Sequence, residues 1–239
     1  SGLSSLVGTV LRSGGSKRVS GDSLNVLLEY LGAVLETDIG MENGTATLSV
    51  LPKDAELGFD LLADLLRNPA FPDDKLELAK TEVKNRIKRR NDDLGTVGIR
   101  SFRSVVYGDH PYGRVQEWSA VKGITAADLA SYHARYFAPN NMMIAISGDF
   151  TKDALKETVN RFFGNWQKGS VELPKAQAVS ATARPGVFQV RKGTNQTNIN
   201  IGALGVKRGS PDIPPINVMN YILGGGSFAS RITSKVRSD

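Results

Sequence analysis

The sequence predicts an α+β fold, in which an antiparallel or mixed sheet carries helices packed on one side. Apolar residues recur at helical spacing in several segments, and two short segments alternate polar and apolar residues. The dipeptide Asn43-Gly44 stands between those two segments and is typical of a β-hairpin. With 239 residues, 40% of them hydrophobic, the chain can form one large domain or one and a half average ones.

Two helices are expected before the hairpin. The first covers residues 4–12 and should end at Gly14-Gly15, because glycine tolerates the left-handed conformation of a helix stop. The second begins at a cap supplied by Ser20 or Asp22. Its apolar stripe consists of leucines at helical spacing: Leu24, Leu27, Leu28 and Leu31.

The hairpin is expected to join strands at residues 34–39 and 45–51. In the second strand Thr45, Thr47 and Ser49 alternate with apolar residues, as in a strand with one face on a core. Helices are then predicted at residues 55–67, 73–91, 95–107, 126–136 and 152–163. Thr125 should cap the fourth of these, and a further apolar strand is predicted at residues 142–147.

A change in composition divides the chain into two domains. Residues 167–185 are polar, contain Ala, Ser and Pro, and lack apolar periodicity, which indicates a linker. We therefore predict a first domain over residues 1–166 and the beginning of a second over residues 186–239. In the second part, strands are expected at residues 187–191 and 198–204, and helices at residues 212–223 and 228–237.

The composition excludes several classes of site. There is no cysteine, so disulfides, thiolate metal sites and cysteine nucleophiles are excluded together. No apolar run is long enough to span a bilayer. The net charge is +6, and its densest run, residues 84–90, lies on a segment whose apolar residues repeat at helical spacing, so these cations are interpreted as a solvated helix face rather than a nucleic-acid site.

The two histidines, His110 and His133, were weighed as catalytic groups. Asp109 and His110 could form an orienter and a base, with Ser119 or Ser147 as nucleophile. There is no Gly-x-Ser-x-Gly elbow, so a serine-hydrolase interpretation has no geometric partners to name. His110 is expected to hold a turn and His133 to pack on a helix.

The chain as a whole resembles the pitrilysin/insulinase family of zinc peptidases. Residues 2–15 are similar to the family's metal-binding helix, which carries an H-x-x-E-H pattern. Further similar segments follow in the family's order: residues 51–54, 61–71, 108–113, 132–141, 147–149, 208–212 and 220–231. The resemblance implies a fold like that shared by LuxS and the processing peptidases.

The ligand positions of that pattern do not carry metal ligands in this chain. On the helix, the two histidine positions correspond to Ser5 and Thr9, and the position of the base corresponds to Gly8. The family's third ligand is a glutamate on a later helix, where this chain has Asn85 and Arg86. Two imidazoles and a carboxylate are the ligands that such a zinc site needs. We therefore predict no bound zinc and no cofactor in this chain.

The resemblance also implies where a peptide substrate would bind. In the family, the strand matching residues 34–39 is a sheet edge that pairs with an extended peptide. The substrate-binding candidates are therefore Val34, Leu35, Glu36, Thr37, Asp38 and Ile39. An arginine followed by a tyrosine contacts substrate from the second domain, and Arg237 matches the arginine. Family members normally begin with further strands, so the chain is expected to be a fragment.

The favoured function is a zinc-less pseudo-peptidase subunit of a heterodimeric metalloendopeptidase. Such a subunit closes the chamber and contacts peptide or unfolded polypeptide, while a homologous partner with an intact H-x-x-E-H pattern carries the zinc. The alternatives are an active zinc endopeptidase with its site completed elsewhere, and an architectural protein like the family's respiratory-complex subunits. A location in the periplasm, or on a membrane from outside the cytoplasm, is expected, with a cytoplasmic one as the alternative.

Overall fold

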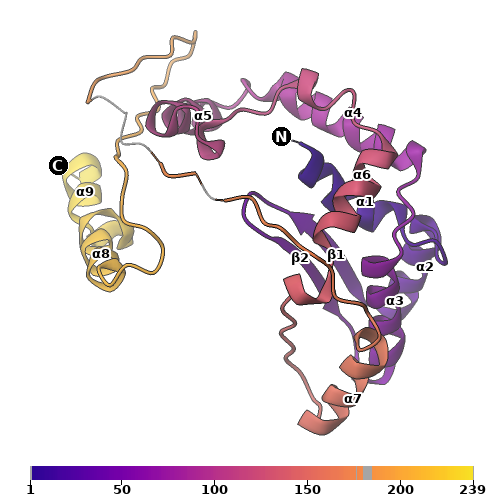
Figure 1. Cartoon of the computed structure of the whole chain (residues 1–239). Helices are drawn as coiled ribbons and strands as arrows, with labels where there is room; N and C mark the ends of the chain where they lie inside the picture. Colours follow the sequence, from indigo (N-terminus) through magenta and orange to yellow (C-terminus); the bar gives the residue numbers. More distant parts are fainter. Residues whose placement is uncertain (1, 176, 180–184, 239) are drawn as a thin grey trace.

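One helix lies at the centre of the molecule. The computed structural model describes residues 2–175, 177–179 and 185–238, with the backbone alone at 237 and 238. Within it, α1 (Leu3–Gly14) packs against β1, α2, α4 and α6 (Figure 1). The four apolar side chains of its inner stripe are at most 1% exposed: Leu6, Val7, Val10 and Leu11. Their spacing places them on one face of the helix, and this face is buried in the core.

The ends of the first two helices follow the chemistry of their caps. Gly15, which follows α1, has φ 73°, a region that favours glycine. For α2 (Gly21–Leu31) the cap is Ser20, whose hydroxyl accepts a hydrogen bond from the Ser23 amide at 3.2 Å. The helix stops at Gly32 in the left-handed conformation, with φ 58°.

The predicted hairpin is confirmed, but its turn is not the expected one. β1 (Val34–Ile39) pairs antiparallel with β2 (Gly44–Ser49), with Val34 opposite Ser49 and Ile39 opposite Gly44. The connection spans residues 40–43 and is closed by a bond from the Gly40 amide to the Asn43 carbonyl at 2.9 Å. Gly44 is already the first strand residue, so Asn43-Gly44 does not form a two-residue turn.

The helices after the hairpin agree with the sequence to within two residues at each end. They are α3 (Ala55–Arg67), α4 (Asp73–Arg89), α5 (Leu94–Tyr107), α6 (Ala126–Tyr136) and α7 (Lys152–Phe163). Thr125 caps α6 as predicted, in a reciprocal capping box with Asp128. Buried residues of α1, α2, β1, α3, α4 and α6 form one hydrophobic core.

The three additional strands predicted from the sequence were wrong. Residues 142–147, 187–191 and 198–204 form no strand in the structure. Apolar side chains in them are largely exposed: Met143 by 93%, Val187 by 100% and Ile201 by 92%. Strand propensity reflects packing against neighbouring strands, and none of the described strands pairs with these segments.

The C-terminal part lies apart from the core. α8 (Ile213–Asn220) and α9 (Arg231–Thr233) stand away from α1 and the hairpin, at the end of an extended connection (Figure 1). Short helical turns flank them at Tyr221–Gly225, Ser227–Ala229 and Ser234–Ser238. The predicted helix over residues 228–237 is thus broken into short pieces. None of the helices described in the chain has the length and apolar character to cross a bilayer.

Candidate functional site

The positions that would hold a metal and a base lie on α1, next to β1. Ser5 is half-buried, Gly8 is buried and Thr9 is exposed. The two positions that correspond to histidines therefore hold hydroxyl groups one turn apart on the helix. Neutral hydroxyls are not among the nitrogen, sulfur and carboxylate ligands of protein zinc sites. This side of α1 offers no metal ligand.

At Gly8 the hairpin packs tightly against α1. The Thr37 hydroxyl donates a hydrogen bond to the Gly8 carbonyl at 2.6 Å. A Cβ atom at Gly8 would lie 2.6 Å from the Ile39 backbone nitrogen and 3.1 Å from the Asp38 carbonyl carbon. Both obstacles are backbone atoms of β1, which cannot rotate away as a side chain can. Any residue larger than glycine here, a glutamate base included, requires β1 to move.

The third ligand position is no better suited to a metal. Asn85 and Arg86 are both exposed on α4. An amide and a guanidinium supply neither the carboxylate of a zinc site nor a favourable local charge. Within the described residues, no three His, Cys, Asp or Glu side chains converge as metal ligands. The residues present thus do not fit a zinc ion.

The strand β1 is an edge of the sheet. It pairs with β2 on one side only among the described strands. Its side chains alternate: Leu35 is fully buried, whereas Val34, Glu36 and Asp38 are exposed. Arg12 on α1 donates from Nε to the Leu35 carbonyl and fixes the strand to the helix. The strand is therefore tied to α1 in an extended form, with the Leu35 carbonyl already bonded to Arg12. Its role in substrate binding stays a prediction.

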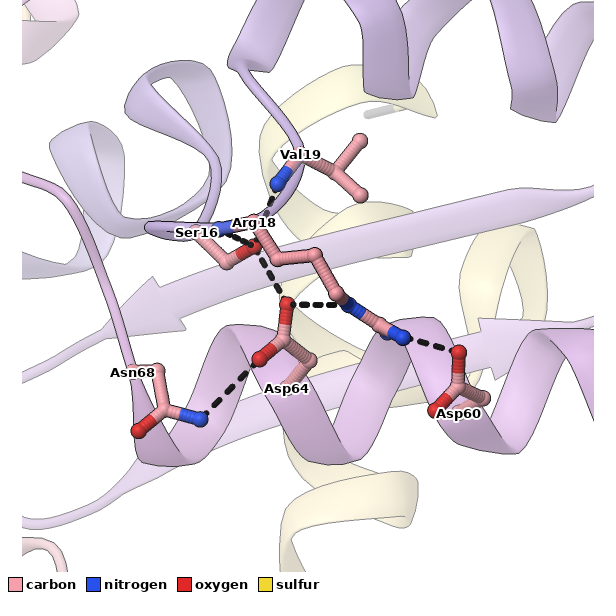
Figure 2. Close-up of polar contacts among 6 residues, drawn as sticks. All are labelled: Ser16, Arg18, Val19, Asp60, Asp64 and Asn68. Carbon is pink, nitrogen blue, oxygen red and sulfur yellow. Dashed lines mark hydrogen bonds and ion pairs between the residues drawn. The ribbon is translucent and has the colours of Figure 1, made fainter.

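A polar cluster fixes the loop between α1 and α2 onto α3 (Figure 2). The Ser16 hydroxyl donates to the Asp64 carboxylate at 2.5 Å and accepts from the Val19 amide at 2.9 Å. Arg18 bridges two acidic residues of α3, with 3.2 Å to Asp64 and 2.6 Å to Asp60. The cluster was not predicted, although the spacing of Asp60 and Asp64 places both on one helix face.

The charge of Asp64 is stabilised in this cluster. Burial alone would raise the pKa of Asp64, but hydrogen bonds from Ser16, Asn68 and Arg18 outweigh it and hold the pKa below its ordinary value of 3.8. Ser16 is 6% exposed, and neither histidine touches it. A buried serine bonded to a carboxylate, with no imidazole to accept its proton, is a structural link and not a nucleophile.

The two histidines have the structural roles expected of them. His110 Nδ1 accepts from the Tyr112 amide at 3.2 Å, and Nε2 lies 3.1 Å from the Gln177 carbonyl. His133 Nε2 lies 2.8 Å from the Leu66 carbonyl, which can only accept, so this nitrogen carries the proton. Burial lowers the pKa of His133. Neither ring faces a nucleophile or a second imidazole.

Arg237 lies in the helical turn Ser234–Ser238. Its side chain lies outside the part of the chain that the structure describes. Its proposed contact with substrate therefore stays a prediction, and so do the domain boundaries at residues 166 and 186.

Known proteins resemble this chain along its whole length. The family model described as "Insulinase (Peptidase family M16)" matches residues 1–115, and that described as "Peptidase M16 inactive domain" matches residues 123–239. A protein of Mycobacterium tuberculosis named an uncharacterized zinc protease is 29% identical over 88% of the chain and 49% of its own length. The chain spans about half the length of the curated relatives it matches.

Two further relatives bear on catalysis and on the fold. A protein of Helicobacter pylori named a non-peptidase homolog is 24% identical over 99% of the chain and 54% of its own length. A crystal structure titled as a peptidase M16 inactive domain from Pseudomonas fluorescens has a TM-score of 0.84 and 23% identity. It covers 100% of this chain, and the chain covers 58% of it. That likeness establishes the fold.

Proposed function

The chain belongs to the insulinase family, peptidase family M16, and on this premise we propose that it is a non-catalytic member which holds peptide instead of cleaving it. The proposal covers a zinc-less subunit that pairs with a homologous, zinc-bearing partner. Together they would form a heterodimeric endopeptidase with a closed chamber. A periplasmic location, with the cytoplasm as the alternative, belongs to the same proposal.

The close approach of β1 to Gly8 is the observation that carries the proposal. A metallopeptidase of this kind needs a carboxylate base at that position to activate water. Here the space for even a methyl group is occupied by the backbone around Ile39, and the Thr37 hydroxyl closes the contact. The helix α1, which would carry the metal ligands and the base, instead buries its apolar side chains in the core.

The ligand positions support the same conclusion independently. Ser5 and Thr9 on α1 and Arg86 on α4 would all have to change before zinc found three protein ligands. A single substitution does not create such a site. The name of the Helicobacter pylori relative, a non-peptidase homolog, agrees with the non-catalytic role proposed for this chain.

Peptide binding is assigned to the edge of β1. Strand addition uses backbone hydrogen bonds, so it needs no metal and no particular side-chain sequence. Arg12 and Thr37 tie the strand to α1, and the side chains of Val34, Glu36 and Asp38 are exposed. We propose that residues 34–39, and Arg237 from the second domain, contact the peptide.

Two measurements on the purified protein test this function. The first is elemental analysis after dialysis against zinc, together with cleavage of a quenched fluorescent peptide library. We expect zinc well below one equivalent and no cleavage. One tightly held zinc per chain, with cleavage abolished by a chelator, would instead support the alternative of an active endopeptidase.

The second measurement tests peptide binding without altering the protein. An extended peptide is titrated beside the same peptide with alternate amides N-methylated, which removes the donors that strand pairing uses. Amide shifts in residues 34–39 should appear with the first peptide and disappear with the second. Equal binding of both peptides would show that the edge of β1 is not the site.

A further inference from the structure

A cleft beside α6 has no role in the function proposed above. It has a volume of about 420 Å³ and is lined by the end of α3, the loop that follows it, α6 and Lys17. This volume is within the range of pockets that bind small molecules. Its walls contain nothing from β1 and none of the degenerate ligand positions of α1 and α4. An inference about the cleft therefore stands apart from the proposed function.

The charged groups of the cleft are all positive. Lys17 and Arg67 line it, and no carboxylate does. Among the described residues, neither cation has a carboxylate within 4 Å, whereas the adjacent Arg18 pairs with Asp60 at 2.6 Å and Asp64 at 3.2 Å. Two cations on the wall of a single cleft, with no carboxylate to neutralise them, give it a positive potential that favours an anionic ligand.

Arg67 is held in place for this role. Its Nη1 donates to the Phe162 carbonyl at 3.2 Å and to Asn165 Oδ1 at 2.7 Å, and the guanidinium lies 5.8 Å from the centre of the Trp166 ring. A guanidinium has five N–H donors in a planar fork. The contacts through one nitrogen fix its plane and leave the other donors available to a carboxylate.

The remaining walls are mostly apolar, with Asn68 as a polar exception. Phe71 and His133 pack edge to face with ring centres 6.0 Å apart, and burial lowers the pKa of His133, which favours the uncharged ring. The other lining side chains of α6 are alanines, Ala126, Ala127 and Ala130, which leave the space open. A ligand seated here would thus place an apolar body against these walls.

We propose that this cleft binds a small carboxylate with an apolar body, held at its charged end by Lys17 and Arg67. Two sources share this chemistry: a free organic acid, and the C-terminal residue of a peptide. The first amides of α6, at Ala126 and Ala127, add a favourable dipole at the same wall. They support the assignment but do not carry it.

Binding is measured by amide chemical shifts with three probes: N-acetyl-leucine, its neutral amide, and acetate. N-acetyl-leucine should bind at least about tenfold more tightly than either of the others, which corresponds to about 1.4 kcal/mol. Shifts should concentrate at Lys17, Ala127 and Ala130. Equal affinity for the amide would refute recognition of the carboxylate, and equal affinity for acetate would refute the apolar part of the cleft.

Variants locate the site. Lys17 is exposed, so Lys17→Met should leave the fold intact and raise the dissociation constant about five- to tenfold, as expected for one charge-assisted contact. Ala130→Leu fills the cleft without changing charge and should abolish binding. Lys88→Met changes net charge equally on the exposed face of α4 and should have no effect. Unaltered binding in either cleft variant would overturn the proposal.

A fourth probe distinguishes the two sources. Acetyl-Ala-Ala-Leu with a free C-terminus is compared with N-acetyl-leucine under the same conditions. Binding at least as tight as that of N-acetyl-leucine would identify peptide C-termini as the ligand class. Loss of binding for the tripeptide would identify free organic acids. The proposal is supported in both cases, and it fails only if the carboxylate or the cleft proves irrelevant.

Discussion

Replacing Gly8 by alanine tests the close contact between α1 and β1. The new Cβ would lie 2.6 Å from the Ile39 nitrogen, well inside the 3.4 Å at which ordinary contact begins. Because the obstacle is backbone, β1 must shift, and overpacking of this kind costs about 1–3 kcal/mol. The shift also weakens the bond between Thr37 and the Gly8 carbonyl, for which about 1 kcal/mol is typical. Alanine regains about 1 kcal/mol through its higher helix propensity.

The expected net effect of Gly8→Ala is therefore a loss of about 1–3 kcal/mol in the free energy of unfolding. Urea denaturation followed by circular dichroism measures it, with an unchanged slope showing that the unfolding reaction is the same. Thr9→Ala is the matched control, because Thr9 is exposed on the same helix and should change stability by less than about 0.5 kcal/mol. A Gly8→Ala protein as stable as the unsubstituted one would refute the contact and the exclusion of a base.

Three further predictions concern stability. Asp64→Asn should lower the free energy of unfolding by about 1.5–3 kcal/mol near neutral pH, because three hydrogen-bond donors lose a charged acceptor. Asp60→Asn, at a more exposed ion pair, should lower it by less than about 1 kcal/mol. Because the pKa of Asp64 is lowered, its contribution to the free energy of unfolding is complete above the unfolded pKa near 3.8 and is lost as pH falls below that value. The stability of the Asp64→Asn protein should therefore fall less on acidification than that of the unsubstituted protein. Burial also lowers the pKa of His133, so its contribution to the free energy of unfolding is complete above the unfolded pKa near 6.5 and is lost as pH falls below it. His133→Phe should flatten this pH dependence. Thr125→Ala should remove about 1 kcal/mol by breaking the capping box of α6, and an equal melting temperature would contradict that role.

The helices could be predicted from the sequence because their signals are local. The cap at Thr125 and the glycine at the end of α1 each act within a few residues, and the structure confirms both. The hairpin was predicted from alternation and from Asn43-Gly44, yet the turn closes one residue earlier. The exact turn depends on how β1 and β2 are aligned, which side-chain alternation does not specify.

The features that failed or were missed depend on contacts between distant segments. Three apolar segments were predicted as strands from composition, but a strand needs a neighbour, and neighbours are not encoded locally. The contacts between Arg18 and the acidic residues of α3 span more than forty residues of sequence. Gly8 was recognised as a missing base from the family pattern, while its tight packing against Ile39 became visible only in the structure.

The packing of β1 on Gly8 has a consequence for how activity could evolve in this chain. Glycine at position 8 allows α1 and β1 to approach closely, and the surrounding core side chains pack at that separation. A substitution that introduces a carboxylate here lowers stability before any metal ligand is present to give it a use. A path to peptidase chemistry in this chain must therefore begin by moving a strand, a change that selection on catalysis alone cannot reward.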